Sequence, residues 1–222
     1  MSNHLRSVVS GPLASSSRLS VGLASLAAAP LASAGIVNGG FEQPNQGYVL
    51  VSQGNTVGGW TCSFGTVEYV HAVANNALPY LQDSAFEGNY WMDLGGVSTG
   101  GIYQNVAGLT AGQAYRISFA QAGNVWGPNF NFSVGVYWNN QQVATFSSVH
   151  GGNDGRNMNW TMRSVDVVAG SGATNRLEFK ALNSTNARGA ALDAITIEPI
   201  PAPAAIAVVL AAPLAGGRRR RG

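Results

Sequence analysis

The sequence predicts an all-β fold, a sandwich of about ten antiparallel strands. Apolar and polar residues alternate with a period of two over most of the middle of the chain, which is typical of half-buried strands. Glycine, asparagine and serine separate these runs, as expected of turns between short strands. Only 10% of the 222 residues are charged, and no segment has convincing helical periodicity. Together these features indicate packed antiparallel sheets.

The first 34 residues are typical of a secretory signal peptide. Residues 1–18 contain two arginines and no acid, residues 19–31 are apolar, and Ala32-Ser33-Ala34 follows. A basic start, an apolar core and a small-x-small sequence form the pattern that a signal peptidase cleaves. We therefore expect Ala32 and Ala34 to form the cleavage site, with cleavage after Ala34 and Gly35 as the first mature residue. The alternative is an N-terminal helix of the mature domain.

The strands are predicted from the alternating runs and the turn residues between them. In the run 129–138, apolar residues such as Phe132 and Val134 alternate with Asn131 and Ser133. The other predicted strands are 48–53, 57–62, 66–73, 89–94, 101–106, 113–121, 141–147, 160–168, 175–182 and the closing strand 190–198. Residues 74–88 lack this pattern and are expected to form a loop with at most one helical turn.

The last 24 residues, 199–222, are predicted to be a removable anchor. A proline cluster begins at Pro199, and because proline cannot continue a strand, the folded domain is expected to stop before it. An apolar run follows at 204–214, shorter than the about 20 residues of a membrane-spanning helix. Arg218, Arg219, Arg220 and Arg221 would stay on the cytoplasmic side of a membrane. The alternative is a basic tail that binds nucleic acid.

The part between these ends, residues 35–198, has the size of one domain and a net negative charge. It contains six basic residues and all ten acidic residues of the chain, a net charge of −4. This charge argues against nucleic acid as a partner. Cys62 is the only cysteine, so no intrachain disulfide can form. A buried, inert thiol is the expected state, and covalent attachment or an intermolecular disulfide is the alternative.

The tail resembles the PEP-CTERM class of sorting signals. The resemblance lies in a proline motif, a short apolar run and terminal arginines, and the motif Ile200, Pro201, Ala202, Pro203 and Ala204 is similar to the Val-Pro-Leu-Pro-Ala variant. It implies a sorting protease of the exosortase/archaeosortase type as partner and only transient membrane contact. It also implies export to the surface or extracellular matrix of a Gram-negative bacterium. The chain departs from the commonest motif because Ala202 stands where a glutamate is usual.

Seven segments of the domain follow one another in a characteristic order: Val37–Glu42, Gly59–Trp60, Gly65–Val70, Met92–Gly96, Gly101–Gln104, Asn157–Trp160 and Ala191–Ile197. In these segments the domain resembles the choice-of-anchor C family, which is similar to plant cell-wall proteins built from galactose-binding-like domains. The resemblance covers nearly all of residues 35–198 and implies a galactose-binding-like jelly-roll β-sandwich. A fold of this kind hosts many ligands, so the resemblance does not name one.

The same resemblance implies a structural calcium ion near the joined ends of the domain; no other cofactor is expected. It places the opening and closing strands side by side and so brings Glu42 and Asp193 together. Carboxylates and backbone carbonyls suit calcium, which takes six to eight oxygen ligands. The alternative is that Glu42 pairs with Arg188 or binds local backbone.

Five residues are candidates for contact with a sugar. Aromatic rings stack on the apolar faces of sugars, and amides bond to hydroxyls. Trp126 lies in a turn-rich loop, and Tyr137 falls on the polar side of its strand. Asn129, Asn139 and Asn140 could supply the amides. Other tryptophans are expected to pack in the core or under loops.

Catalysis has little support in the sequence, and the chain is not expected to be an enzyme. No nucleophile elbow, His-Glu-x-x-His helix or phosphate-binding glycine loop is present. Glu68 and Asp93 are the one pair that could be proposed as glycosidase carboxylates. The residues therefore favour a non-catalytic surface module that binds polysaccharide. The alternative is a structural envelope or biofilm matrix protein that binds other proteins.

Overall fold

The structure is a computed structural model, and it describes residues 35–72, 84–124, 130–149, 158–184 and 187–201. These residues belong to one compact unit and form strands, turns and loops without a helix. Accordingly, no helix in the described part of the chain is long and apolar enough to cross a bilayer.

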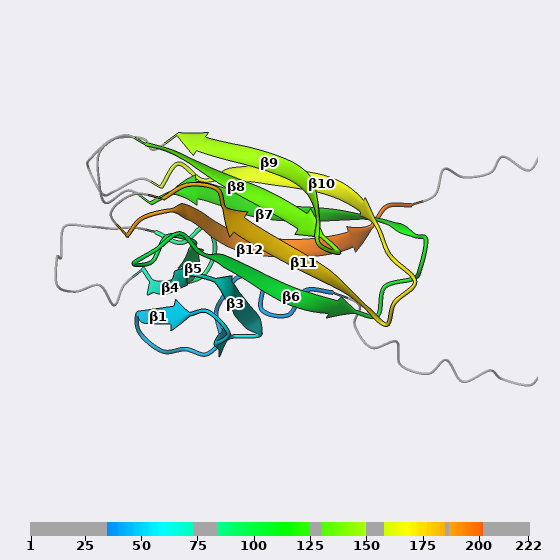
Figure 1. The fold of residues 1–222 in the computed structure, drawn as a ribbon, viewed down its shortest axis with the longest axis horizontal. Helices are drawn as coiled ribbons and strands as arrows, with labels where there is room; N and C mark the ends of the chain where they lie inside the picture. Colours follow the sequence, from blue (N-terminus) through cyan, green and yellow to red (C-terminus); the bar gives the residue numbers. More distant parts are fainter. Residues whose placement is uncertain (1–34, 73–83, 125–129, 150–157, 185–186, 202–222) are drawn as a thin grey trace, which may run out of the picture. The chain divides into compact units, whose positions relative to one another are not determined.

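In the described residues, twelve strands form two sheets of six, and every pair of neighbours is antiparallel (Figure 1). The first sheet has the order β1 (Val49–Ser52), β4 (Thr66–His71), β5 (Tyr90–Asp93), β12 (Ala190–Pro199), β7 (Ala114–Gly123), β10 (Thr161–Val168). The second has the order β2 (Thr56–Val57), β3 (Trp60–Phe64), β6 (Gly101–Ala107), β11 (Thr174–Ala181), β8 (Asn131–Trp138), β9 (Gln141–Val149). Because the chain passes repeatedly from one sheet to the other, the arrangement is a jelly-roll sandwich, which confirms the predicted fold class.

The predicted strands match the observed ones except near glycine and proline. The run 57–62 was predicted to be one strand, which is wrong: Gly58 and Gly59 have φ angles of 56° and 87° and turn the chain between β2 and β3. Glycine adopts such left-handed angles without a steric penalty. At the other end, β12 continues through Pro199 rather than stopping before it, and Ile200 still donates to the Ala114 carbonyl at 2.9 Å.

The core lies between the inner faces of the two sheets. Phe119 of β7 meets Phe179 of β11 across this space with ring centroids 4.9 Å apart, and both side chains are fully buried. Trp60 packs 6.2 Å from Phe179 on the same side. Burying each large side chain stabilises the fold by about 1.5–3 kcal/mol. Cys62 is buried in this core as a free thiol, as expected.

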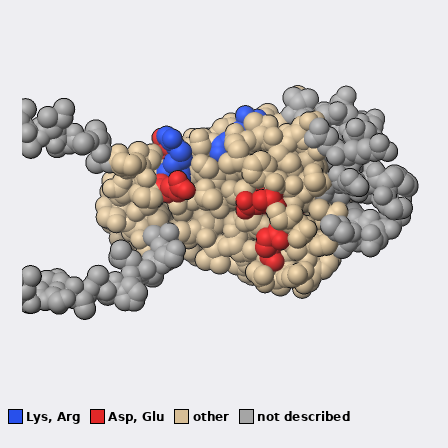
Figure 2. Space-filling view, turned by 180° about the vertical axis from the view of Figure 1, so that it is seen from behind, with Lys and Arg blue, Asp and Glu red and all other residues tan. Residues whose placement is uncertain are grey.

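The outer faces of the two sheets differ. A second, smaller apolar cluster covers part of the first sheet, where Trp91 and Met158 are buried and the partly buried Trp160 packs against them. The Nε1 of Trp160 donates to the Ser84 carbonyl, so this tryptophan packs beneath a loop. Among the described residues, the outer face of the second sheet carries polar side chains that are mostly partly or fully exposed. Charges are sparse, and Figure 2 shows them scattered on a mostly uncharged face.

Candidate functional site

A row of polar and aromatic side chains crosses five strands on the outer face of the second sheet. Tyr103 on β6 lies opposite Glu178 on β11, which in turn lies opposite Tyr137 on β8. Thr61 on β3 and Gln142 on β9 extend the row at its two ends. Strands alternate their side chains, so the neighbours of these residues point into the core. With about 4.8 Å between strands, the row is about 19 Å long.

Ion pairs and ring contacts hold the centre of this row together; we call Tyr103, Tyr137, Arg176, Glu178 and Lys180 the Glu178 network. Arg176 Nε donates to Glu178 Oε2 at 3.2 Å, and Lys180 Nζ lies 3.5 Å from Oε1. The Arg176 guanidinium carbon lies 3.4 Å from the Tyr103 ring centre, and Lys180 Nζ lies 4.2 Å from that of Tyr137. Each such cation–ring contact contributes about 0.5–2 kcal/mol.

The network buries its acid and leaves its cations partly exposed. The Glu178 side chain is 5% exposed, against 28% for Arg176 and 32% for Lys180. Two cations balance the carboxylate, which permits its burial, because an unpaired charge at this depth would be costly. One positive charge remains in excess within the network.

Hydroxyl and amide groups continue the polar surface on the β8–β9 side. Tyr137 Oη donates to Gln142 Oε1 at 2.8 Å, and Gln142 Nε2 donates to Thr145 Oγ1 at 2.7 Å. Ser133 and Ser147 share a hydrogen bond of 2.8 Å further along the same strands. These bonds fix side chains that would otherwise rotate freely in solvent.

Beside Tyr103 the surface is hollowed to a volume of about 340 Å³, lined by Val37, Gly59, Thr61, Tyr103, Gln104 and Asn105. Gln104 shapes this hollow by holding the opening segment of the domain. Its Oε1 accepts from the backbone N–H of Val37 at 2.7 Å, and its Nε2 donates to the carbonyls of Val37 and Gly59. The hollow is therefore a fixed feature at one end of the row.

Of the three predicted sugar contacts that the structure describes, Tyr137, Asn139 and Asn140, only Tyr137 lies in this row. It lies on the outer face with Ser133, as its position in the strand predicted. Asn139 and Asn140 form the β8–β9 turn with φ angles of 49° and 69°, and Asn139 also accepts from the Arg176 backbone N–H. Such a two-residue turn needs left-handed residues, which explains these asparagines. Trp126 and Asn129 lie outside the described residues.

Sequence reasoning missed Tyr103, Arg176, Glu178 and Lys180 as a site. Alternation in the run 175–182 already placed Glu178 and Lys180 on its polar side. Their partners come from β6 and β8, and the register between strands so distant in sequence is not visible in the sequence. Register is set by core packing of the whole sheet.

The two predicted calcium ligands meet at one segment, residues 86–90. Asp193 accepts from the backbone N–H groups of Phe86 at 2.8 Å and Glu87 at 3.1 Å, and Glu42 Oε1 accepts from Asn89 at 2.9 Å and Tyr90 at 3.0 Å. Glu42 therefore binds local backbone, which is one of the alternatives to a calcium site that the sequence left open. Burial raises the pKa of Asp193 to about 7, and the backbone N–H groups of Glu87, Ala194 and Phe86 oppose this rise.

This donor set fits calcium poorly. Both oxygens of Asp193 already accept hydrogen bonds from backbone N–H groups: Oδ2 from Phe86 and Oδ1 from Ala194, the latter at 2.7 Å. Oε1 of Glu42 accepts two further backbone hydrogen bonds. In the part of the chain that the structure describes, no group of three or more His, Cys, Asp or Glu side chains could hold a metal ion. Calcium takes six to eight oxygens, so further ligands would be needed. The calcium site stays a prediction.

The second candidate pair of carboxylates is not arranged for catalysis. Glu68 and Asp93 lie opposite each other on β4 and β5, but Asp93 is fully buried. Its oxygens accept from the Gly95 backbone N–H at 2.7 Å and the Asn124 amide at 2.5 Å. Burial raises the pKa of Asp93 to about 7 and also raises that of Glu68, to which Tyr48 donates. A glycan cannot reach Asp93, so this pair does not supply a glycosidase mechanism.

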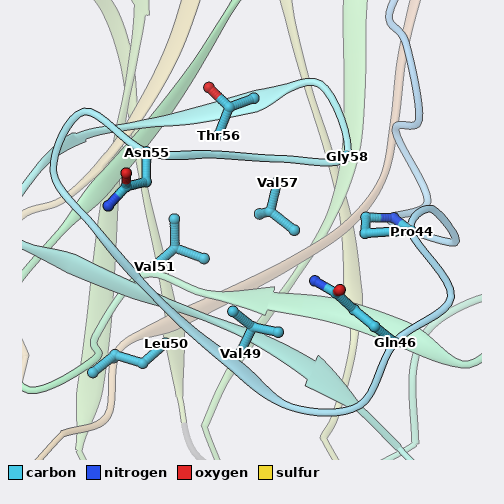
Figure 3. A pocket seen from close by; sticks show the side chains of 9 residues that line it. All are labelled: Pro44, Gln46, Val49, Leu50, Val51, Asn55, Thr56, Val57 and Gly58. Carbon is cyan, nitrogen blue, oxygen red and sulfur yellow. The ribbon is translucent and has the colours of Figure 1, made fainter.

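A further hollow, of about 310 Å³, opens between the edge strands β1 and β2 (Figure 3). Val49, Val51 and Val57 line it with apolar surface, and Gln46 and Asn55 supply amides at its rim. Leu50 beside it is 41% exposed. The hollow is separate from the Glu178 network, which belongs to the middle strands of the second sheet.

The predicted processing sites lie mostly outside the described residues. These are Ala32, Ala34, Ala202, Pro203, Ala204 and the arginines 218–221. Ile200 and Pro201 are described, and the Ile200 carbonyl accepts from Gln113 Nε2 at 2.8 Å. Ile200, the first residue of the predicted motif, is therefore attached to the folded domain.

No model of a known protein family matches the chain. Halomucin of Haloquadratum walsbyi is 25% identical over 169 residues, which cover 73% of this chain. The chain spans only 2% of the length of that protein. The resemblances to the choice-of-anchor C family and to PEP-CTERM signals therefore stay predictions.

Among solved structures, the chain is similar to several carbohydrate-binding modules. A xylan-binding domain from Paenibacillus barcinonensis is 16% identical, with 70% of this chain and 95% of that one covered and a TM-score of 0.43. A module in complex with β-1,4-galactotriose is 13% identical, with 74% and 97% covered and a TM-score of 0.43. A family 35 module from Clostridium thermocellum is 14% identical, with 68% and 98% covered and a TM-score of 0.42. Similarities of this size do not assign a ligand to this chain.

Proposed function

We propose that this chain is a non-catalytic carbohydrate-binding module that holds a polysaccharide on the outer face of its second sheet. The observation that carries the proposal is the row through Tyr103, Glu178 and Tyr137, which crosses an open sheet face. Its length of about 19 Å suits an extended chain of sugars better than a single one.

The chemistry of the row matches that of a sugar chain. Pyranose rings present apolar C–H faces, which pack on aromatic surface, and hydroxyls, which bond to amides and side-chain hydroxyls. Tyr103 and Tyr137 supply the aromatic surface; Gln142, Asn105 and Thr61 supply amide and hydroxyl groups beside them. Because cation–ring contacts hold both tyrosines, and hydrogen bonds hold Gln142 and Thr61, little conformational entropy is lost when a ligand binds.

We further propose that the chain is exported and sorted to a bacterial surface. Residues 1–34 would be removed as a signal peptide, and a protease of the exosortase/archaeosortase type would cleave at the motif 200–204. Membrane contact would then be transient, through the apolar run 204–214 alone. The low charge of residues 35–198 and their polar turns are consistent with an extracellular module.

The proposed function is tested by retention of the purified protein in gels that contain single polysaccharides. Tyr103→Ala and Tyr137→Ala are expected to lose most of the retention, about ten-fold in affinity for each ring. Tyr48→Ala is the matched control, because Tyr48 is exposed just before β1 of the first sheet and its removal leaves the row intact.

The result that would overturn the proposal is equal retention of the two row variants and the wild-type protein. Failure of the wild-type protein to bind any polysaccharide, together with self-association or capture of a surface protein, would favour the matrix-protein alternative. Melting curves of each variant show whether a lost interaction reflects lost folding.

A further inference from the structure

We infer that the polysaccharide is acidic, and that carboxylates of its uronic acid residues bind between Arg176 and Lys180. This inference rests on the proposed function and narrows it to a substrate class. It is carried by the charge of the Glu178 network, by its unused hydrogen-bond donors and by the rigidity of its cations.

The charge of the outer face is opposite in sign to that of the domain. Among the described strand residues of that face, the charged side chains are Arg176, Glu178 and Lys180, which sum to +1. The remainder of residues 35–198 holds four basic and nine acidic residues. One cation would be enough to balance the charge of Glu178, and binding of a neutral sugar requires no second one. The second cation leaves a local field that favours a bound anion.

The two cations keep donors that Glu178 does not use. In the described part of the chain, Arg176 donates to Glu178 through Nε. The N–H groups on its two terminal nitrogens are then left to bind a ligand, and Lys180 has three donors on Nζ. A planar guanidinium matches the two oxygens of a carboxylate, and such charge-assisted bonds are about twice as strong as neutral ones.

The cations are also fixed in place before a ligand arrives. The Arg176 guanidinium lies over the Tyr103 ring and the Lys180 ammonium lies over the Tyr137 ring, while Glu178 binds both from between. Exposed ion pairs gain little, because long side chains must be ordered and water screens the charges. Here the ring contacts and ion pairs already order both cationic side chains, and the tyrosines exclude water from one side of each cation.

The experiment compares one polysaccharide with and without its charge. Alginate, a polymer of uronic acids, is offered to the purified full-length protein by isothermal calorimetry, beside carboxyl-reduced alginate as its neutral counterpart. Dextran sulfate serves as the probe for sulfate esters and for simple charge attraction. We expect alginate to bind at least ten-fold more tightly than the reduced polymer, and more tightly than dextran sulfate at about 0.15 M salt.

Two charge variants locate the effect. Lys180→Gln and Arg176→Gln each leave one cation to balance Glu178, so each fold is expected to persist while the excess charge disappears. Each should weaken alginate binding about ten-fold more than it weakens binding of the reduced polymer, which depends on the cations only through the rings that they hold. Arg116→Gln is the matched control: it removes the same charge from an exposed pair with Asp166 on the first sheet.

The outcomes separate this inference from the function on which it rests. Equal binding of alginate and reduced alginate would overturn the acidic substrate class and leave the polysaccharide-binding function intact. Tighter binding of dextran sulfate would assign the face to sulfate esters instead of carboxylates. No binding to any polysaccharide would overturn both. A loss with Arg116→Gln equal to that with Lys180→Gln would show an effect of net charge and contradict the site.

Discussion

Glu178 Oε2 lies 3.2 Å from Arg176 Nε in the middle of an open sheet face, and the Arg176 guanidinium in turn covers the ring of Tyr103. Lys180 repeats this arrangement on the other side of Glu178, over Tyr137. A strand needs no such network for its backbone pairing, since β11 is already paired on both edges. The network instead fixes two rings and two cations at the surface, which is what a preformed binding face requires.

Replacement of the central acid tests whether the network is held by its ion pairs. Glu178→Gln leaves Arg176 and Lys180 without a counterion, so we expect a loss of about 2 kcal/mol in the free energy of unfolding. Chemical denaturation measures it. Asp166→Asn is the control, because it breaks the exposed pair with Arg116, which water screens, and its loss should be much smaller. Equal losses in the two variants would contradict a special role for Glu178.

Two buried carboxyls make stability depend on pH in an unusual direction. Burial raises the pKa of Asp93 and of Asp193 to about 7, whereas an unfolded aspartate titrates near about 3.9. Between these values the folded chain binds more protons than the unfolded chain, so stability falls as the pH rises from about 4 to about 7. We expect a melting temperature about 5 °C higher at pH 5 than at pH 8.

Asp93→Asn identifies the source of this dependence. It removes one of the two titrating groups, so the difference in melting temperature between pH 5 and pH 8 should shrink. A wild-type melting temperature that rises from pH 5 to pH 8 would contradict the raised pKa values.

Chelation tests the predicted calcium ion at Glu42 and Asp193. A ligand that binds only the folded state raises its stability with concentration, so bound calcium predicts a lower melting temperature in a chelator and recovery when calcium is returned. Melting curves with and without the chelator decide this directly. Unchanged melting curves would contradict the calcium site. Glu42 and Asp193 would then act only by binding the backbone at residues 86–90.

Export and sorting predict the two ends of the mature protein. Intact mass of the protein recovered from the surface of its host should correspond to a chain that starts at Gly35 and lacks Arg218–Arg221. Retention of the arginines on surface protein would contradict proteolytic sorting. Retention of residues 1–34 would contradict the signal peptide.

Local pattern predicted most of the fold but little of the site. Alternation predicted the run 175–182, which forms β11 at Thr174–Ala181, and the run 129–138, which forms β8 at Asn131–Trp138. The side-by-side placement of Tyr103, Glu178 and Tyr137 depends on the order of strands in the sheet. That order is decided by packing across the whole core, which no local pattern contains.

Chemical-shift mapping of a uronic acid oligosaccharide on the isotopically labelled protein tests the central claim most directly. Our account predicts that the largest changes fall on Tyr103, Tyr137, Arg176 and Lys180 and on the strands β6, β8 and β11 that carry them. Changes confined to residues 84–89, or to the hollow between β1 and β2, would place the ligand elsewhere and contradict it.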